Sequence, residues 1–500
     1  HPFHRQSNWI NRNLLLAGNF NMTNVDELFQ ELVEIGQYPK EKSDTVTVLE
    51  KIGHFLDDEV QRLHTWFKPD GYTNQDINQL IFENLDIQRL LRRASKKFDG
   101  GYVLGGLLGH GDAFMMRDPN GIRPAFWYMD EEVIAAASER PALQTVFNAH
   151  FNDVKELKPG HALIIKCSGK VMEQPFADPR EKRACSFERI YFSRGNDREI
   201  YLERKKLGEQ LARPVLEAID FDLEHTVFSY IPNTAEAAFY GLVEGLEKEI
   251  NAWKHHQILQ AKNAKKLTDE KLVQILSTRA RVEKLIHKDE KQRTFIADTK
   301  SRNSMVSYVY DVTYGLVQND KDTLVLLDDS IVRGTTLRDS IVSIASRLRP
   351  KRIIILSSAP QIRFPDCYGI DMSKMKDFVA FQALVSLLKE QGKEKLLEDT
   401  CRRCRDSENI PVEMVKNEVV QLYDAFEYGQ ISNRIAKLIT PEGIKPEIKV
   451  IFQTLDGLHA ACPTTSGDWY FSGRYPTPGG SRVANRAFVK FMENVDERAY

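Results

Sequence analysis

The chain has 500 residues, 42% of them hydrophobic, and its 69 Lys and Arg nearly balance its 71 Asp and Glu, which gives a net charge of −2. This balance argues against a nucleic-acid or membrane partner that binds through a general charge field. No run approaches the roughly 18 uninterrupted apolar residues of a membrane-spanning helix. The six cysteines are too sparse for a disulfide scaffold. We therefore expect a soluble, cytoplasmic chain of roughly two to four domains, with no nucleic acid and no membrane among its partners.

The first part of the chain, from Leu14 to about Gly169, alternates short apolar runs with turn residues. This alternation predicts strands near 13–17, 102–104, 113–116 and 161–165, with helices at 24–35 and 46–67. The pattern is typical of a layered α+β domain. The opening His1-Pro2-Phe3 resembles the inside of a domain, so we expect that sequence upstream of His1 is missing.

From about Thr226 the pattern changes to apolar strands followed by helices, which predicts a parallel sheet. The expected strands are 227–231, 323–327 and 352–357, and the expected helices are 234–248 and 336–348. Residues 244–292 are rich in Lys and Glu with a helical period and no apolar strand, so we predict an inserted helical hairpin with a solvated face. After Thr440 the chain is rich in Pro, Gly and Ser, which predicts an irregular wrapping tail.

The predicted strand at 324–327 runs directly into Asp328-Asp329-Ser330-Ile331-Val332-Arg333-Gly334-Thr335-Thr336. The N–H groups of such a loop and the start of a helix can hold a phosphate, because unpaired donors and the helix dipole favour negative charge. The two carboxylates can accept hydrogens from ribose hydroxyls and can hold Mg²⁺, which prefers oxygen ligands. The alternative is that the Asp pair only caps the helix, but the whole string favours a sugar-phosphate site.

With this loop the sequence resembles the type I phosphoribosyltransferases and, among them, the glutamine phosphoribosylpyrophosphate amidotransferase family of purine synthesis. Further matching strings are Phe187-Glu188-Arg189-Ile190-Tyr191-Phe192-Ser193-Arg194, Arg293-Thr294-Phe295-Ile296, Ser357-Ser358-Ala359-Pro360-Gln361-Ile362-Arg363-Phe364-Pro365 and Tyr368-Gly369-Ile370-Asp371-Met372. The resemblance implies that Asp328 and Asp329 bind Mg²⁺ and the ribose of phosphoribosyl pyrophosphate. It assigns the 5′-phosphate to the residues that follow, which include Ser330, Arg333, Gly334, Thr335 and Thr336.

The resemblance extends upstream to the segments 16–24, 43–45, 117–124 and 137–139. It implies a glutaminase of the N-terminal-nucleophile type, in which Asn19 stabilises the oxyanion and Asp44 fixes the glutamine. The family's N-terminal Cys, which attacks the glutamine amide, is absent from this chain, whose first cysteine is Cys167. Phe20 stands where the family has the Gly of the oxyanion hole. We expect truncation to explain the missing Cys, and degeneration of the glutaminase is the alternative.

Two departures from the family pattern concern the transferase half. Ala235 replaces a family Ser that contacts the metal, so the two Asp residues would bind Mg²⁺ with more water and pyrophosphate oxygens. In the family a mobile basic loop closes over pyrophosphate. Lys300 and Arg302 could supply its charge here, although the downstream basic pair of the family is missing.

The cysteines allow two interpretations. Some members of the family carry a structural [4Fe–4S] cluster, and Cys185, Cys367 and Cys462 match positions near its ligands. Cys401 and Cys404 have the spacing of a metal-ligand pair but occur earlier than the family pattern places them. Buried unreactive thiols are the favoured account.

The sequence therefore predicts an incomplete α+β glutaminase of the N-terminal-nucleophile type, followed by an α/β phosphoribosyltransferase with a parallel sheet. The expected parts are a partial amidotransferase domain (1–182), a transferase domain (183–440) with the insert 244–292, and a tail (441–500). The expected activity forms phosphoribosylamine from phosphoribosyl pyrophosphate and ammonia derived from glutamine. The alternatives are a transferase for another nucleophile and a non-catalytic regulator that binds phosphoribosyl pyrophosphate. Family membership also implies a homo-oligomer and purine nucleotide effectors.

Overall fold

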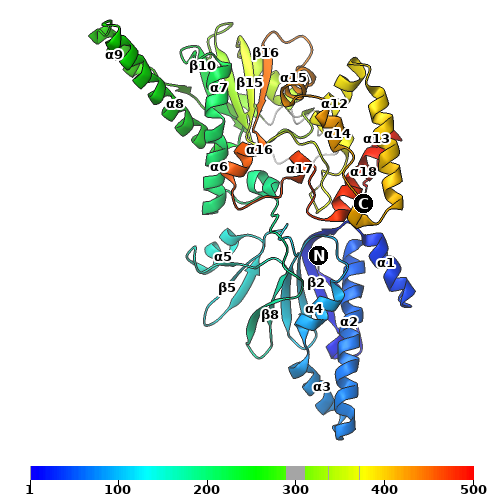
Figure 1. The fold of residues 1–500 in the computed structure, drawn as a ribbon. Helices are drawn as coiled ribbons and strands as arrows, with labels where there is room; N and C mark the ends of the chain where they lie inside the picture. Colours follow the sequence, from blue (N-terminus) through cyan, green and yellow to red (C-terminus); the bar gives the residue numbers. More distant parts are fainter. Residues whose placement is uncertain (1, 289–309, 336, 371, 500) are drawn as a thin grey trace.

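A computed structural model describes residues 2–288, 310–335, 337–370 and 372–499. Figure 1 shows two halves, with antiparallel sheets in the lower half and a parallel sheet in the upper half. Across the described ranges, no helix combines the length and the apolar composition needed to cross a membrane. The change from antiparallel to parallel strands agrees with the change of sequence pattern near Thr226.

The lower half is built on a six-stranded antiparallel sheet. Its order is β1 (Phe3–Arg5), β2 (Leu14–Met22), β3 (Gly100–Leu108), β4 (Ala113–Arg117), β8 (His161–Ile165) and β9 (Val171–Pro175). Leu14 and Leu16 of β2 point toward the helices and are fully buried. They join one core with Ile52 and Leu56 of the long helix α2 (Asp44–Phe67). Ser43 caps α2, its Oγ accepting from the backbone N of Val46 at 3.4 Å.

A smaller sheet covers the other face of this sheet. Its strands lie in the order β6 (Ile134–Ala137), β5 (Phe126–Met129) and β7 (Lys155–Glu156). Val103 and Leu163 of the large sheet pack against Trp127 of the small one. The helices α1 (Val25–Glu34), α3 (Asn74–Asn84), α4 (Ile87–Ala94) and α5 (Arg140–Phe147) complete the half. The layers confirm the predicted α+β class.

The upper half contains a five-stranded parallel sheet. Its order is β11 (Arg281–Val282), β10 (Thr226–Tyr230), β14 (Thr323–Asp328), β15 (Arg352–Ser357) and β16 (Glu447–Phe452). Side chains alternate between two cores, so Leu324 and Leu326 face one side while Val325 and Leu327 face the other. Burial on both faces explains why β14 is an uninterrupted apolar run. The run ends at Asp328, which places the acidic pair at the carboxyl edge of the sheet.

Helices cover both faces of the parallel sheet, as right-handed crossovers require. They are α6 (Arg198–Gln210), α7 (Ala212–Ala218), α8 (Glu236–Asn263), α12 (Val379–Glu390) and α15 (Tyr428–Leu438). Beyond them lie α13 (Glu394–Asp406), which packs against the C-terminal part of the chain, and α14 (Val420–Asp424). The helix predicted at 336–348 is present as a helical turn, Leu337–Val342, followed by α11 (Ser343–Ser346). β12 (Ile286–Lys288) and β13 (Tyr310–Val312) form a separate two-stranded sheet.

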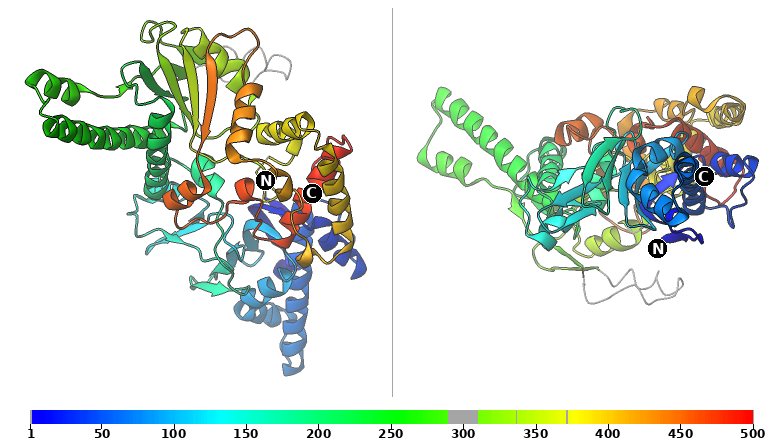
Figure 2. Two further views of the ribbon diagram at one scale, coloured as in Figure 1. Left: turned by 45° about the horizontal axis from the view of Figure 1, so that its top comes forward. Right: turned by 90° about the horizontal axis from the view of Figure 1, so that it is seen from below.

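Two expectations from the sequence are wrong in part. The chain after Thr440 is not irregular, because β16 joins the parallel sheet beside β15 and α16 (Leu455–Ala461), α17 (Trp469–Ser472) and α18 (Pro478–Met492) follow. The segment 244–292 does contain strands, since β11 and β12 lie within it. Its helical hairpin is present as the distal part of α8 and α9 (Asp269–Ser277), and it projects from the molecule in Figure 2. The domain boundaries at 182 and 440 stay predictions.

The two halves are joined by buried polar contacts. Arg123 donates from Nε to the backbone O of Tyr368 at 2.9 Å and also forms an ion pair with Glu188. Asn21 donates from Nδ2 to the backbone O of Cys367 at 2.8 Å. Arg123 and Asn21 come from the antiparallel half, whereas their partners belong to the part that follows it. The contacts fix the end of β2 against the loop that precedes Met372.

Candidate functional site

A cavity of about 480 Å³ opens at the carboxyl edge of the parallel sheet. Asp328, Asp329 and the residues up to Thr335 form one wall of it, directly after β14. Asn233 and Thr234, which follow β10, form the neighbouring wall. Ligand sites in open α/β sheets occur at this edge, because the loops after adjacent strands converge there.

Hydrogen bonds from the next strand fix the backbone of the acidic pair. The backbone O of Asp328 accepts from the N–H of Ser358 at 3.0 Å, and the backbone O of Asp329 accepts from the Ser358 hydroxyl at 3.0 Å. The N–H of Ala359 also donates to the backbone O of Asp329 at 3.0 Å. Ser330 donates its hydroxyl to Oδ1 of Asp329 at 2.8 Å. The backbone of the pair and the Asp329 carboxyl group are therefore held by hydrogen bonds within the chain.

Burial disfavours the charged form of both carboxyl groups of the acidic pair. Burial, and then the charge of Asp329, raises the pKa of Asp328 well above its usual range, and burial raises the pKa of Asp329 to about 6. Across the described residues, neither carboxylate forms an ion pair with a Lys, Arg or His. Two desolvated carboxylates side by side fit a divalent cation, which would complete its shell with water and phosphate oxygens.

The loop that follows offers unpaired donors. None of the backbone N–H groups of residues 331–335 donates a hydrogen bond to another described residue. The loop is nevertheless anchored, since Val379 donates from its backbone N to the backbone O of Val332 at 2.9 Å. Gly334 has a φ of +73°, and a Cβ there would lie 3.0 Å from Cγ2 of Val379. Several N–H groups converging on one position form an anion-binding concavity.

Arg333 is described in the structure, whereas Thr336 of the predicted phosphate loop is not. Arg333 lies on the cavity wall, and its guanidinium is 3.6 Å from Oδ2 of Asp377. Thr336 lies outside the described residues, as do Lys300 and Arg302 of the predicted basic loop. Lys288 and Tyr310, the described residues on either side of 289–309, both line the cavity.

Aromatic side chains form the part of the cavity that sequence analysis did not assign. Tyr191, Phe192 and Tyr310 line it together with Met372. Burial, followed by the charges of Asp328 and Asp329, raises the pKa of Tyr310 to about 12. Tyr191 and Phe192 belong to the string 187–194, which matches the family pattern. That match was the one signal in the sequence that could have marked them as site residues. Their place in the cavity follows only from the fold.

The two residues predicted to handle glutamine lie on different elements of the antiparallel half. Asn19 is exposed in the middle of β2 and lines a second cavity, of about 420 Å³, with Arg123 and Gly369. Asp44 is the first residue of α2, accepts from the Thr45 hydroxyl at 3.3 Å, and does not line this cavity. Burial raises the pKa of the Asp44 carboxyl.

Ala235 is fully buried and does not line the 480 Å³ cavity, so it offers no ligand there. The two cavities adjoin, because Phe192 and Met372 line both of them. Among the described residues, these two apolar side chains are the ones that line both cavities.

Comparison with known proteins identifies relatives that carry one name. An amidophosphoribosyltransferase from Pasteurella multocida is 27% identical over 383 residues, which is 74% of this chain and 64% of that protein. One from Lachancea kluyveri is 29% identical over 345 residues, 66% of this chain and 60% of that protein. The matches thus span less than two thirds of these two relatives. No protein-family model matches the chain.

Solved structures give the same answer for the fold. A glutamine phosphoribosylpyrophosphate amidotransferase from B. subtilis, complexed with ADP and GMP, superposes with a TM-score of 0.60 at 22% identity. The superposition covers 95% of this chain and 79% of that one. A second structure, of an allosteric regulatory enzyme of purine biosynthesis, gives 0.60 at 21% identity. This chain is a relative of the amidophosphoribosyltransferases.

The relationship confirms the predicted fold class, a glutaminase-type pair of antiparallel sheets followed by a type I phosphoribosyltransferase sheet. A [4Fe–4S] cluster was one of the two interpretations of the cysteines in the sequence. Cys185, Cys367 and Cys462 are buried, but in the described part of the chain no three His, Cys, Asp or Glu side chains come together as a metal-ligand group. The predicted cluster therefore does not fit these residues.

The cysteines have other neighbours instead. The thiol of Cys185 is 3.6 Å from the hydroxyl of Tyr470, and burial raises the pKa of Cys185 to about 12. Burial likewise raises the pKa of Cys404 to about 12, on helix α13. Protonated thiols in apolar surroundings are unreactive and bind metals poorly. Buried thiols, the favoured account from the sequence, agree with this arrangement.

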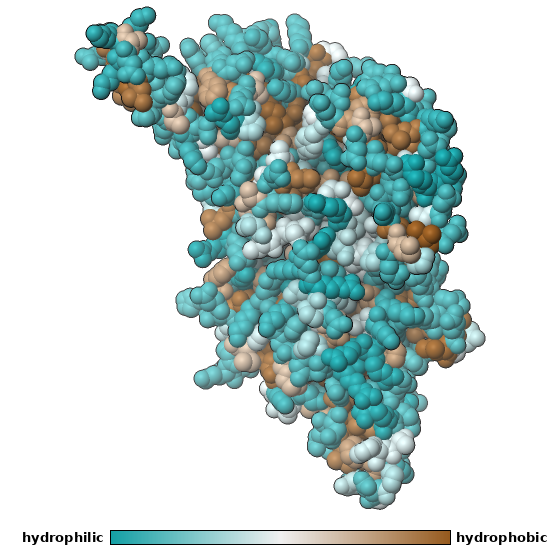
Figure 3. Space-filling view, viewed as in Figure 1, coloured by the Kyte–Doolittle hydropathy of each residue, from teal (hydrophilic) through white to brown (hydrophobic). Residues whose placement is uncertain are grey.

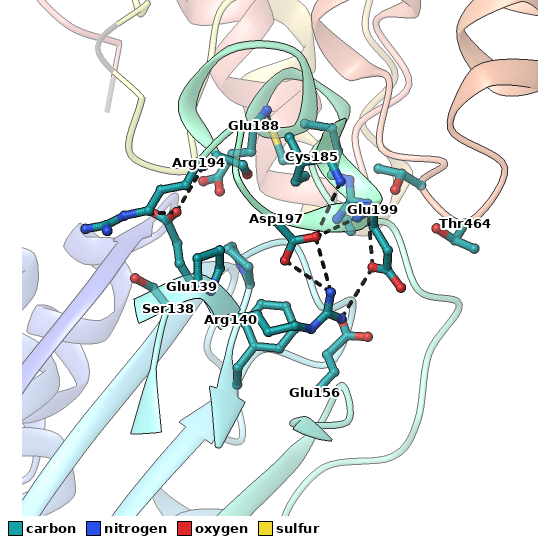
Figure 4. Close-up of a pocket in the computed structure, with 18 of the residues that line it drawn as sticks. Ser138, Glu139, Arg140, Glu156, Cys185, Glu188, Arg194, Asp197, Glu199 and Thr464 are labelled. Atoms are coloured by element: carbon teal, nitrogen blue, oxygen red, sulfur yellow. Dashed lines mark hydrogen bonds and ion pairs between the residues drawn. The ribbon is translucent and has the colours of Figure 1, made fainter. Parts of the chain in front are cut away.

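A third cavity, of about 160 Å³, lies between the two halves and is drawn in Figure 4. Arg140 donates to Oδ2 of Asp197 at 3.1 Å and to Glu199 at 3.4 Å, and Arg194 donates from its backbone N to Glu139 at 3.0 Å. These groups pair with one another across the cavity. They stabilise the contact between the halves and leave the acidic-pair cavity as the candidate for chemistry.

Proposed function

We propose that this relative of the amidophosphoribosyltransferases forms phosphoribosylamine from phosphoribosyl pyrophosphate and ammonia. One observation carries the proposal. Asp328 and Asp329, held rigidly and without a cationic partner in the described structure, lie beside a loop whose N–H groups at 331–335 are unpaired. An acidic pair and an anion-binding loop in one cavity match the two ends of a sugar phosphate.

The substrate would bind with its two ends in different parts of the cavity. The N–H groups of residues 331–335 would take the 5′-phosphate, and Asp328 with Asp329 would accept hydrogens from the ribose hydroxyls. Mg²⁺ on the same carboxylates would neutralise charge on the pyrophosphate. Asn233 and Thr234 lie opposite, where the pyrophosphate would extend. The cavity volume of about 480 Å³ is in the range of small-molecule sites.

The reaction needs positioning more than acid–base chemistry. The nitrogen lone pair of ammonia forms the new bond to the anomeric carbon, while the bond from that carbon to the pyrophosphate oxygen breaks and its electron pair leaves on pyrophosphate. The new ammonium group then loses a proton to solvent. Tyr191, Phe192 and Tyr310 would limit water around the reacting carbon, and fixed charges would stabilise the departing pyrophosphate.

Ammonia from glutamine would reach the site from the cavity that contains Asn19. Phe192 and Met372 form the common wall between the two cavities, and their apolar side chains favour neutral ammonia over ammonium. Asn19 would stabilise an oxyanion and Asp44 would bind glutamine. Phe20, which is half-buried, follows Asn19 directly on β2.

A second function is favoured by a different observation. Ala235 is buried where the family has a metal-contacting Ser, so the chain could bind phosphoribosyl pyrophosphate as a non-catalytic regulator. Pyrophosphate release with phosphoribosyl pyrophosphate, Mg²⁺ and ammonium separates the two. We expect release that depends on ammonium and is lost in Asp328→Asn/Asp329→Asn. Substrate binding without release above background would support the regulator instead.

The setting of the reaction is also part of the proposal. All six cysteines are free, which favours a reducing compartment such as the cytoplasm. Purine nucleotides are candidate effectors, because the B. subtilis structure holds ADP and GMP. A homo-oligomer is expected by relationship.

A further inference from the structure

The α8–α9 arm, residues 236–277, is the largest projection of the molecule (Figure 2). Helix α8 has 28 residues and is therefore about 42 Å long. Its first half is seated on α6, where a Cβ at Gly241 would clash with the backbone O of Lys205 at 1.7 Å. Beyond Ile250 the described arm buries only Ala261 and Ile275. Such a two-helix projection is weakly supported by its own packing.

One exposed stripe runs the whole length of α8. It passes from Tyr240 through Glu244, Glu247, Asn251, His255 and Leu259 to Lys262, all of them exposed. The spacing of three or four residues keeps these side chains on one side of the helix. Tyr240 is 49% exposed and Leu259 is 43% exposed, so each end of the stripe carries an apolar group. Figure 3 also shows apolar atoms on the tip of the arm, among polar neighbours.

The two ends of the arm carry opposite charge. Residues 236–250 contain four acidic side chains and one Lys, whereas residues 251–277 contain five Lys and two acidic side chains. Along the stripe the acidic groups are Glu244 and Glu247, and the basic groups are His255 and Lys262. Glu244 already pairs with Lys205 of α6, whereas Glu247 makes no ion pair within the described structure.

We propose that the arms of two copies of this chain pair antiparallel through this stripe, with the two-fold axis at Asn251. An antiparallel pair centred there sets Glu247 of each copy opposite His255 of the other, and Tyr240 opposite Lys262. The acidic part of each arm, residues 236–250, then meets the basic part of the other arm. Each Lys262 ammonium lies over a Tyr240 ring, where cation–π attraction acts. A two-fold interface of this kind uses the same surface on both copies.

The charge distribution decides against the other ways of covering the arm. A parallel pair would set basic tip against basic tip, which like charges oppose. A polyanion would bind the basic tip but would leave Tyr240 and the acidic residues at 236–250 exposed. Only an antiparallel second copy uses both ends of the stripe at once.

Disulfide trapping tests the register directly in the full chain. The background carries Cys167→Ser, since Cys167 is the exposed cysteine among the six. Asn251→Cys places two thiols at the two-fold axis, within reach of a disulfide. His256→Cys is the matched control, because it is exposed on the same helix but turned about 140° away. We expect a cross-linked dimer from Asn251→Cys under mild oxidation and little from the control. Equal yields, or none from Asn251→Cys, would overturn the proposal.

A charge exchange tests the chemistry of the contact. Glu247→Lys sets Lys opposite His255, and His255→Glu sets two carboxylates together. Each change occurs twice in a two-fold pair, so each should weaken self-association about tenfold by sedimentation equilibrium. The double variant creates a Lys–Glu pair and should return to within about threefold of the original. Additive weakening in the double variant would contradict the pairing, as would unchanged association in both single variants.

Discussion

Burial raises the pKa of the Asp329 carboxyl from its ordinary value of 3.8 to about 6. Between these values the folded chain holds a proton that the unfolded chain has lost, so the free energy of unfolding falls as pH rises from about 4 to about 6. Asp329→Asn removes the contribution of Asp329 to this dependence, while the contribution of the buried Asp328 carboxyl stays. We expect the variant to gain about 1 to 3 kcal/mol at neutral pH while substrate binding is lost.

Urea titrations at several pH values between 4 and 8 provide the measurement for Asp329→Asn. Asp339→Asn is the control, because Asp339 is exposed and pairs only with the neighbouring Arg338. The control should follow the pH dependence of the unaltered chain. If Asp329→Asn destabilises the chain at pH 7, the carboxyl is not held at an energetic cost and the account of the acidic pair is wrong.

Gly334→Ala addresses the phosphate loop without touching a charge. The left-handed φ of Gly334 and the 3.0 Å approach to Val379 both oppose a side chain there. We expect a loss of about 1 to 2 kcal/mol in stability and weaker substrate binding. Gly315→Ala shares the positive φ but meets no atom within 4 Å. It should lower stability with binding unchanged, and equal binding losses would refute a specific role for the loop.

Site residues that are neighbours in the chain could be predicted from the sequence. The acidic pair and its loop are one string, so their place at a strand end could be predicted from the apolar run before them. Phe192 and Met372 could not be assigned in this way, because they are 180 residues apart and meet only after the two halves pack. Asn19 and Asp44 were grouped by resemblance, but the structure gives them no common cavity.

Helix α18 is the element through which the end of the chain binds the antiparallel half. Asp99 accepts from the backbone N of Gly479 at 3.0 Å, from the hydroxyl of Thr477 at 2.5 Å and from that of Thr23 at 2.6 Å. The carboxylate therefore caps α18 and joins it to the end of β2. Loss of one such side chain leaves three donors without this acceptor.

We expect Asp99→Ala to lower stability by about 2 to 3 kcal/mol in thermal or urea unfolding. Asp86→Ala is the comparison, since Asp86 caps α4 through one bond, from the backbone N of Arg89 at 2.9 Å. It should cost about 1 kcal/mol. Equal effects of the two variants would show that the joint between α18 and β2 contributes little.

The elements missed from the sequence are the short or unusual ones. β16 was mistaken for part of an irregular tail, because its surroundings are rich in Pro and Gly and because it pairs with β15, some 90 residues earlier. β11 has two residues and β12 has three, too few to establish a period of two. The long helix α2 was evident because its pattern persists over many turns, whereas α8 was divided between the predicted helix at 234–248 and the predicted insert.

The whole molecule depends on the joint around Arg123. Its guanidinium is buried between Glu188 and the backbone O of Tyr368, so it connects the antiparallel half to the transferase half. Arg123→Met would leave the Glu188 carboxylate buried without a partner, at a cost of about 3 to 5 kcal/mol. We expect calorimetry of this variant to show separate transitions for the two halves.

The double variant Arg123→Met/Glu188→Gln provides the comparison, because it removes the unpaired charge as well. It should recover part of the lost stability. If the single and double variants unfold alike, the ion pair does not hold the halves together.

The central claim is that Asp328, Asp329 and the loop at 330–335 form one site for phosphoribosyl pyrophosphate with Mg²⁺. The most direct test is calorimetric titration of the full chain with phosphoribosyl pyrophosphate, with and without Mg²⁺, beside Asp328→Asn/Asp329→Asn. We predict saturable binding to one site per chain, strengthened by Mg²⁺ and lost in the double variant. Equal binding by both proteins would contradict the account, because the ligand would then be held elsewhere.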